Sequence, residues 1–165
     1  MVDSMLNELC REAAITRRVL ERVPGDSLEW KPHPKSMSLG QLALHVATIP
    51  CNLSGLAKVE EFDASQSNFD PPTPGNVEEI LTTHDEGLSV AQDYLSSVDD
   101  QTLQGSWRLT FKGKEVFTVP RGEFIRSVML NHWYHHRGQL SVYLRLLDVP
   151  VPVIYGRSAD ENPFA

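Results

Sequence analysis

Apolar side chains recur at steps of three and four residues along four long stretches of the chain, and this spacing is typical of amphipathic helices. The stretches cover residues 3–23, 38–56, 76–98 and 121–147. Helix-ending signals follow two of them, a "PG" pair after the first and "DVPVP" after the last. The pattern therefore predicts four long helices.

Three of these helices carry signals at their N-termini. Ser38 and Gln41 fit a capping box, in which a hydroxyl and an amide each satisfy an unpaired backbone N–H. Asn76 with Glu79 predicts a similar cap, and Pro120 suits the first turn of the last helix. These residues define where the second, third and fourth helices begin.

The connections complete the predicted fold. Residues 61–75, rich in Pro, Asp and Ser, predict the longest loop, so the second and third helices can lie far apart. Within residues 106–120, "SWRLTF" and "EVFTVP" flank a "KGK" turn, as in a β-hairpin. Pro50 should remove one backbone hydrogen bond and bend the second helix between Val46 and Pro50. We expect an all-α four-helix bundle, with a small β-hairpin between helices three and four, forming a single domain over residues 1–165.

Composition narrows the class of protein. With 15 basic and 22 acidic residues the formal net charge is −7, and no run of Lys or Arg offers the positive footprint that nucleic acid requires. No apolar run approaches the roughly 20 residues that cross a bilayer, and the first residues do not form a signal peptide, so we expect a cytoplasmic protein without a membrane partner. Cys10 and Cys51 lack a CxxC spacing, and we expect both to be small apolar core residues.

Histidines gather in "NHWYHHRGQL", residues 131–140, within the last predicted helix. On a wheel of about 100° per residue, His132 and His136 share a face that should point into the core. Their Cβ atoms should lie about 5–6 Å apart, so both rings can reach one metal ion. Imidazoles on an apolar face need hydrogen bonds or a metal, and we interpret this pair as metal-binding. The apolar residues on the same face are Ile125, Val128, Met129 and Tyr143.

A third ligand has two candidates. His45 lies on the apolar face of the second helix and His84 on that of the third, and geometry alone leaves the choice open. Taken singly, His84 is also explained as a hydrogen-bonded core residue. We expect His33, which lies between two prolines, to be at the surface. We expect His135 to be a supporting residue on the flank of the last helix.

Other polar residues could support the site. Gln139, on the same face as the histidine pair, can hydrogen-bond a ligand or a metal-bound water. Asn52 and Tyr143 can reach the same region, whereas Arg137 points elsewhere and suits a structural ion pair or a dimer contact. No carboxylate falls on the predicted metal face, so the general base stays unassigned.

The order of "SLGQLALHVA", "NHWYHHRGQL" and "VPVPVIYGRSADE" resembles the DinB/YfiT-like family of metal-dependent enzymes. The resemblance covers nearly the whole chain, and its most specific part is the H-x-x-x-H-R-G-Q run. It implies a four-helix bundle with a divalent metal held by three histidines, which correspond to His45, His132 and His136 here. His84 matches no ligand position in this pattern. Arg157 stands where the family commonly has proline, which weakens the match at the C-terminus.

Three neutral imidazoles leave a coordination position open, as in a catalytic metal site. Nitrogen ligands suit Zn²⁺ and Ni²⁺ best and are compatible with Fe²⁺, Co²⁺ or Mn²⁺. Such a metal makes a nucleophile of water or of a thiol at neutral pH. The resemblance also implies a link to transferases and isomerases that use low-molecular-weight thiols, and to pairing of two chains, so we expect a homodimer.

The sequence therefore predicts a metal-dependent enzyme with a small-molecule substrate: a transferase that uses a low-molecular-weight thiol, or a hydrolase. The alternative from another class is a non-catalytic protein that binds a metal or a small ligand in a stress response. A third interpretation is a helical interaction module whose core histidines are only hydrogen-bonded. Metal content and turnover separate the three.

Overall fold

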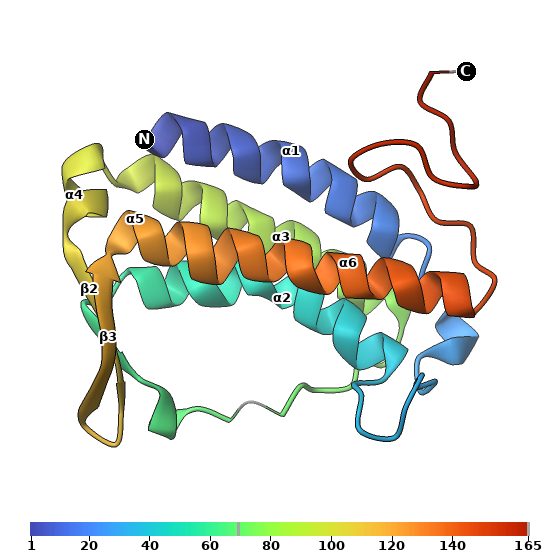
Figure 1. The fold of residues 1–165 in the computed structure, drawn as a ribbon, viewed down its shortest axis with the longest axis horizontal. Helices are drawn as coiled ribbons and strands as arrows, with labels where there is room; N and C mark the ends of the chain where they lie inside the picture. Colours follow the sequence, from blue (N-terminus) through green and yellow to red (C-terminus); the bar gives the residue numbers. More distant parts are fainter. Residues whose placement is uncertain (69, 165) are drawn as a thin grey trace.

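The computed structural model describes residues 1–68 and 70–164 and confirms the predicted helical bundle (Figure 1). The first three long helices are α1 (Val2–Leu20), α2 (Leu39–Ala57) and α3 (Val77–Ser97). The last one begins as α5 (Arg121–Phe124), passes through the π-helical segment η3 (Ile125–Leu130) and continues as α6 (Asn131–Leu146). Both α1 and α2 pack against α3 and against α6, so the four helices enclose one core.

Every long helix contributes apolar side chains to this core. Leu9 of α1, Leu42 of α2, Ile80 of α3 and Leu140 of α6 are each at most 1% exposed. Removing such side chains from water is the main force that holds amphipathic helices together. Along residues 1–68 and 70–164, no helix combines the length and the apolar character needed to cross a membrane.

The helix starts agree with their sequence signals. Ser38 Oγ accepts the Gln41 backbone N–H at 3.2 Å, and Gln41 Oε1 accepts the Ser38 N–H at 2.9 Å, which completes the capping box. Asn76 Oδ1 accepts the Glu79 N–H at 2.9 Å. Local hydrogen bonds of this kind depend on a few neighbouring residues, so the sequence predicts them well.

The segment between α2 and α3 differs from its predicted role. Rather than separating the two helices, it runs back along the bundle, so that α2 and α3 point the same way and pack side by side (Figure 1). The Tyr94 hydroxyl of α3 accordingly donates to the carbonyl of Ala57 at the end of α2, at 2.9 Å. Gly87 permits the close approach, because a Cβ there would lie 3.2 Å from Cβ of Cys51. The length of the connection serves parallel packing, not distance between the helices.

The predicted hairpin is present, as β2 (Ser106–Phe111) paired with β3 (Lys114–Pro120). A third strand, β1 (Glu61–Asp63), lies parallel to β2 inside the segment that we expected to be a loop. The Asp63 carboxylate accepts the backbone N–H groups of Lys112 and Gly113, both at 3.0 Å, and so joins β1 to the hairpin turn. The sequence prediction missed β1 because three residues are too few to show an alternating pattern.

Three short helical elements were also missed in the sequence: η1 (Gly25–Ser27) after α1, η2 (Ala64–Gln66) after β1 and α4 (Asp100–Gln104) before β2. The side chain of Asp99 caps α4 by accepting the Thr102 N–H at 2.7 Å. With the strands, α4 covers one end of the bundle (Figure 1). Single-turn helices carry no apolar periodicity, so only their capping residues could have revealed them.

The expectation that both cysteines are core residues is wrong for Cys10, which is exposed. Cys10 lies about 100° round α1 from the buried Leu9, on the flank that faces solvent, where its sulfur accepts a hydrogen bond from Gln92 Nε2 at 3.1 Å. Cys51 is half-buried against Gly87. A small apolar residue at the edge of a helical stripe is therefore a weak guide to burial.

A charged network lies inside the bundle between α1 and α6. Arg137 is 1% exposed and donates to Glu12 Oε2 at 2.6 Å and to Thr16 Oγ1 at 3.0 Å. The hydroxyl of Tyr155, from the C-terminal segment, donates to the same carboxylate at 2.8 Å. Of the two roles expected for Arg137, the structural ion pair is thus present, and it lies inside the core.

Candidate metal centre

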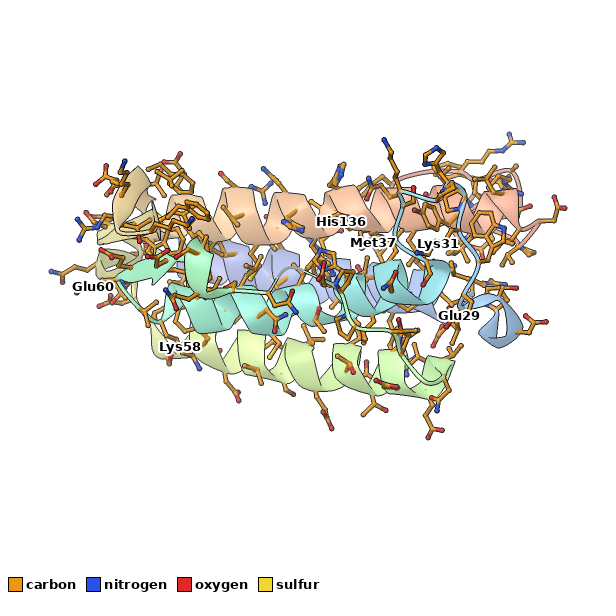
Figure 2. All side chains as sticks on the ribbon, turned by 90° about the horizontal axis from the view of Figure 1, so that it is seen from below. Glu29, Lys31, Met37, Lys58, Glu60 and His136 are labelled. Carbon is orange, nitrogen blue, oxygen red and sulfur yellow. The ribbon has the colours of Figure 1, made fainter. Side chains whose placement is uncertain are left out.

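Three histidines from two helices meet between α2 and α6. His45 comes from α2, and His132 and His136 come from α6; one ring nitrogen from each lies within 4.8 Å of the other two. The Nε2 atoms of His45 and His132 are 3.0 Å apart, and the ring centroids of His45 and His136 are 4.5 Å apart. Figure 2 shows His136 on the side of α6 that faces α2. The structure therefore brings together the histidine pair of the last helix and, of the two candidates for a third ligand, the one that the family resemblance implies, His45.

This cluster fits a metal ion. Imidazole nitrogens bind Zn²⁺ at about 2.0–2.1 Å, so two such ligands of a tetrahedral ion lie about 3.3 Å apart. The 3.0 Å separation between His45 and His132 is close to that value, and a ring nitrogen of His136 lies within 4.8 Å of both. Among the described residues, no other group of three or more potential ligands lies close enough together to hold a metal.

All three imidazoles are held in the neutral form that binds metals. Burial, and then the nearby His136 and His132, lower the pKa of His45 to about 4. Burial is also the main cause that lowers the pKa values of His132 and His136. A lowered pKa favours the neutral ring, so protons compete less with a metal for its nitrogens.

The helical wheel predicted that the histidine pair points into the core, and this prediction is wrong. Both rings are half-buried, and the core face of α6 lies about 100° away, in line with Trp133. The reason is η3: a π-helical segment holds more residues per turn, so an apolar face followed through it at 100° per residue drifts away from its true direction. The fully buried residues of α6 are Trp133, Arg137, Leu140 and Leu144.

One hydrogen bond joins the two helices beside the cluster. Pro50 has no N–H, so the carbonyl of Val46, four residues earlier, lacks its usual partner within α2. The indole N–H of Trp133 donates to that carbonyl at 2.9 Å. Since Val46 follows His45 and Trp133 follows His132, this buried bond fixes the distance between the helices at the point where the ligand side chains begin.

We expect Trp133→Phe to weaken metal binding about tenfold and to lower the free energy of unfolding by about 1–3 kcal/mol, because the Val46 carbonyl would stay buried without a partner. Trp107→Phe is a matched control, since the Trp107 indole donates to another α2 carbonyl, that of Leu56, at 3.0 Å. Urea unfolding and competition with a coloured chelator measure the two quantities. Equal metal affinities in the two variants would show that the Trp133 bond does not position the histidines.

The predicted supporting residues differ in where they lie. Gln139 Oε1 is 2.7 Å from His136 Nδ1, so a proton on Nδ1 can be shared with the amide while Nε2 remains free to bind. Asn52 is exposed and lines a pocket beside the cluster. Tyr143 belongs elsewhere: its hydroxyl donates to the Met37 carbonyl at 3.4 Å and its ring meets Trp30 edge to face.

The other histidines lie outside the cluster. His84 is 1% exposed on α3, behind Trp133, with ring centroids 6.2 Å apart. Its Nδ1 is 3.0 Å from Asp85, and burial lowers its pKa, as for a hydrogen-bonded core histidine. His135 is exposed and contacts only the edge of the cluster, with its ring centroid 5.0 Å from that of His136, and His33 is exposed in its loop.

A pocket of about 490 Å³ opens beside the cluster, with His45 and His132 in its wall. Part of the opposite wall is the segment around Asp70 and Pro71, whose carbonyl accepts a hydrogen bond from Gln41 Nε2 at 3.1 Å. No sequence pattern predicts this wall, because irregular backbone has no period and its position depends on contacts that are distant in sequence.

Comparison with known proteins agrees with this fold. The family model of the DinB family matches residues 1–162. The uncharacterized protein YrdA of Bacillus subtilis (strain 168) is 28% identical over 162 residues, which cover 97% of this chain and 91% of YrdA.

Two solved structures have the same fold. A DinB-like protein from Bacillus cereus ATCC 10987 has a TM-score of 0.68 at 24% identity, over 93% of this chain and 97% of that one. The DinB-like protein YjoA from Bacillus subtilis has a TM-score of 0.71 at 17% identity, over 91% and 96% of the two chains. Fold and cluster define a helical bundle with a possible three-histidine metal site. The chain belongs to the DinB family.

Proposed function

We propose that this protein is a metal-dependent enzyme that acts on small molecules, either as a transferase that uses a low-molecular-weight thiol or as a hydrolase. The observation that carries the proposal is the meeting of His45, His132 and His136 beside a pocket whose wall includes His45 and His132. Three protein ligands would leave one position on the metal open. Catalytic metal sites keep such an open position, whereas in structural sites the protein fills all four.

The residues of the chain would divide the work. The three histidines would hold a divalent ion, with Zn²⁺ or Ni²⁺ favoured by their nitrogen donors. When bound, such an ion supplies a position at which the pKa of water or of a thiol is lowered. Gln139 would keep His136 in the tautomer that binds through Nε2, and the pocket would hold the second reactant next to the open side.

Metal analysis followed by turnover assays tests this proposal. Protein purified without a histidine tag is stripped with a chelator and titrated with Zn²⁺ and with Ni²⁺; we expect it to bind one ion per chain. The loaded protein is then assayed for S-transfer from mycothiol, bacillithiol or glutathione to an electrophile, and for ester and amide hydrolysis. Metal binding without turnover would favour a non-catalytic binding protein. No metal binding, with stability indifferent to chelator, would favour an interaction module.

A further inference from the structure

The pocket beside the cluster is elongated along α2. Its α2 lining includes His45, Ile49, Leu53 and Leu56, which follow one another at steps of three or four residues and so form one stripe of the helix. With a rise of 1.5 Å per residue, the stripe from His45 to Leu56 is about 16 Å long. Phe62 of β1 also lines the pocket. The cavity is thus a trough that leads from the histidines towards the strands.

The second wall of the trough is held in place by α2 itself. Gln41 uses its side-chain oxygen to complete the cap of α2 and its side-chain N–H to bind the Pro71 carbonyl at 3.1 Å. One amide therefore ties the start of the helix to the segment that faces the stripe. The described residues of this wall are Ser67, Asn68, Asp70, Pro71 and Pro72.

The described lining of the trough carries a negatively charged side chain and no positively charged one. Among the described lining residues there is no Lys or Arg, and Asp70 is the one carboxylate. A carboxylate or phosphate on the body of a ligand would lose water against Leu53 and Leu56, would find no cation, and would be repelled by Asp70. An uncharged apolar chain has none of these costs.

We propose that the trough binds an elongated, uncharged and largely apolar molecule whose head group reaches the three histidines. This inference rests on the proposed function and names the substrate class of the same site. It excludes reactants whose bodies carry carboxylates, such as glutathione, from the trough, and it favours apolar electrophiles or esters, or a thiol with an uncharged body.

Binding of three hydroxamic acids to the Zn²⁺-loaded protein tests the proposal by calorimetry. Acetohydroxamic acid offers the head group alone, octanohydroxamic acid adds an apolar chain, and octanedioic acid monohydroxamate ends the same chain in a carboxylate. Since each buried methylene contributes about fourfold, we expect octanohydroxamic acid to bind at least ~100-fold more tightly than acetohydroxamic acid. The carboxylate-ended analogue should bind at least ~10-fold more weakly than octanohydroxamic acid.

Matched variants locate the chain. Leu53→Asn should reduce the preference for octanohydroxamic over acetohydroxamic acid about tenfold. Leu88→Asn should leave the preference unchanged, because Leu88 is likewise half-buried but lies on α3 and does not line the pocket. Affinity for acetohydroxamic acid in each variant reports whether the site is still folded. If the preference is absent in the parent protein, if the carboxylate-ended analogue binds equally well, or if both variants lose the preference alike, the inference is overturned. If Zn²⁺ does not bind, the proposed function itself fails.

Discussion

His45→Ala is expected to reduce the affinity for Zn²⁺ or Ni²⁺ by more than about 100-fold. Loss of a residue that merely orients a ligand costs 10–100-fold, and His45 would be a ligand itself, supplied by α2 to a pair on α6. Without His45, the remaining two imidazoles lie on one half-buried helix flank and cannot enclose an ion. Competition with a coloured chelator measures the loss.

The same variant should lose the thermal stabilisation that the metal provides. A ligand at about 100 times its Kd stabilises the folded state by about 2.7 kcal/mol, which for a chain of this size raises Tm by about 5–10 °C. His135→Ala is the control, because His135 lies between His132 and His136 on α6 but is exposed and outside the cluster. Retention of the shift by His45→Ala, or its loss from both variants, would contradict the assignment of His45 as a ligand.

Arg137→Met is expected to lower the free energy of unfolding by about 3–5 kcal/mol, because removal of one member of a buried ion pair leaves the other charge without compensation. The residue left behind is Glu12, which is 8% exposed and keeps only the Tyr155 hydroxyl as a side-chain donor. For a chain of this size the loss corresponds to a fall in Tm of roughly 6–20 °C. Urea or thermal unfolding of the metal-free protein measures it.

Two further variants test the reason for this loss. Arg126→Met removes an exposed arginine that pairs with Glu8, and we expect a loss below about 1 kcal/mol. The double variant Glu12→Gln with Arg137→Met should recover part of the stability, since no buried charge remains. A double variant that is less stable than Arg137→Met alone would show that the side-chain contacts, not the unpaired charge, account for the effect.

The local parts of this molecule could be predicted from the sequence. Caps at Ser38 and Asn76 need only a few neighbouring residues, and the pairing of His132 with His136 follows from the spacing of one helix turn. The choice between His45 and His84 needed the family resemblance, because both lie on apolar faces. In the structure, parallel packing of α2 and α3 places His84 behind Trp133.

Features that depend on distant contacts or irregular geometry could not be predicted. The helical wheel uses one constant angle per residue, which does not hold through η3. The prediction therefore placed the histidine pair on the core face. Asp70 lies in a segment without periodicity, so its place in the pocket wall had no signal. The burial of Arg137 could not be predicted either, because a charged residue interrupts the apolar pattern of a core face. It can be recognised as a core residue only once its partner on α1, Glu12, is known.

The bond between Trp133 and the Val46 carbonyl implies that positions 50 and 133 are coupled in evolution. Pro50 cannot provide an N–H to that carbonyl, and the Trp133 indole supplies the hydrogen bond in its place. In a relative with any other residue at position 50, a backbone N–H can satisfy this carbonyl within its own helix, and an indole at position 133 is then only a second donor to it. An alignment of the family should therefore show proline and tryptophan gained and lost together at these two positions, next to histidines that need not change.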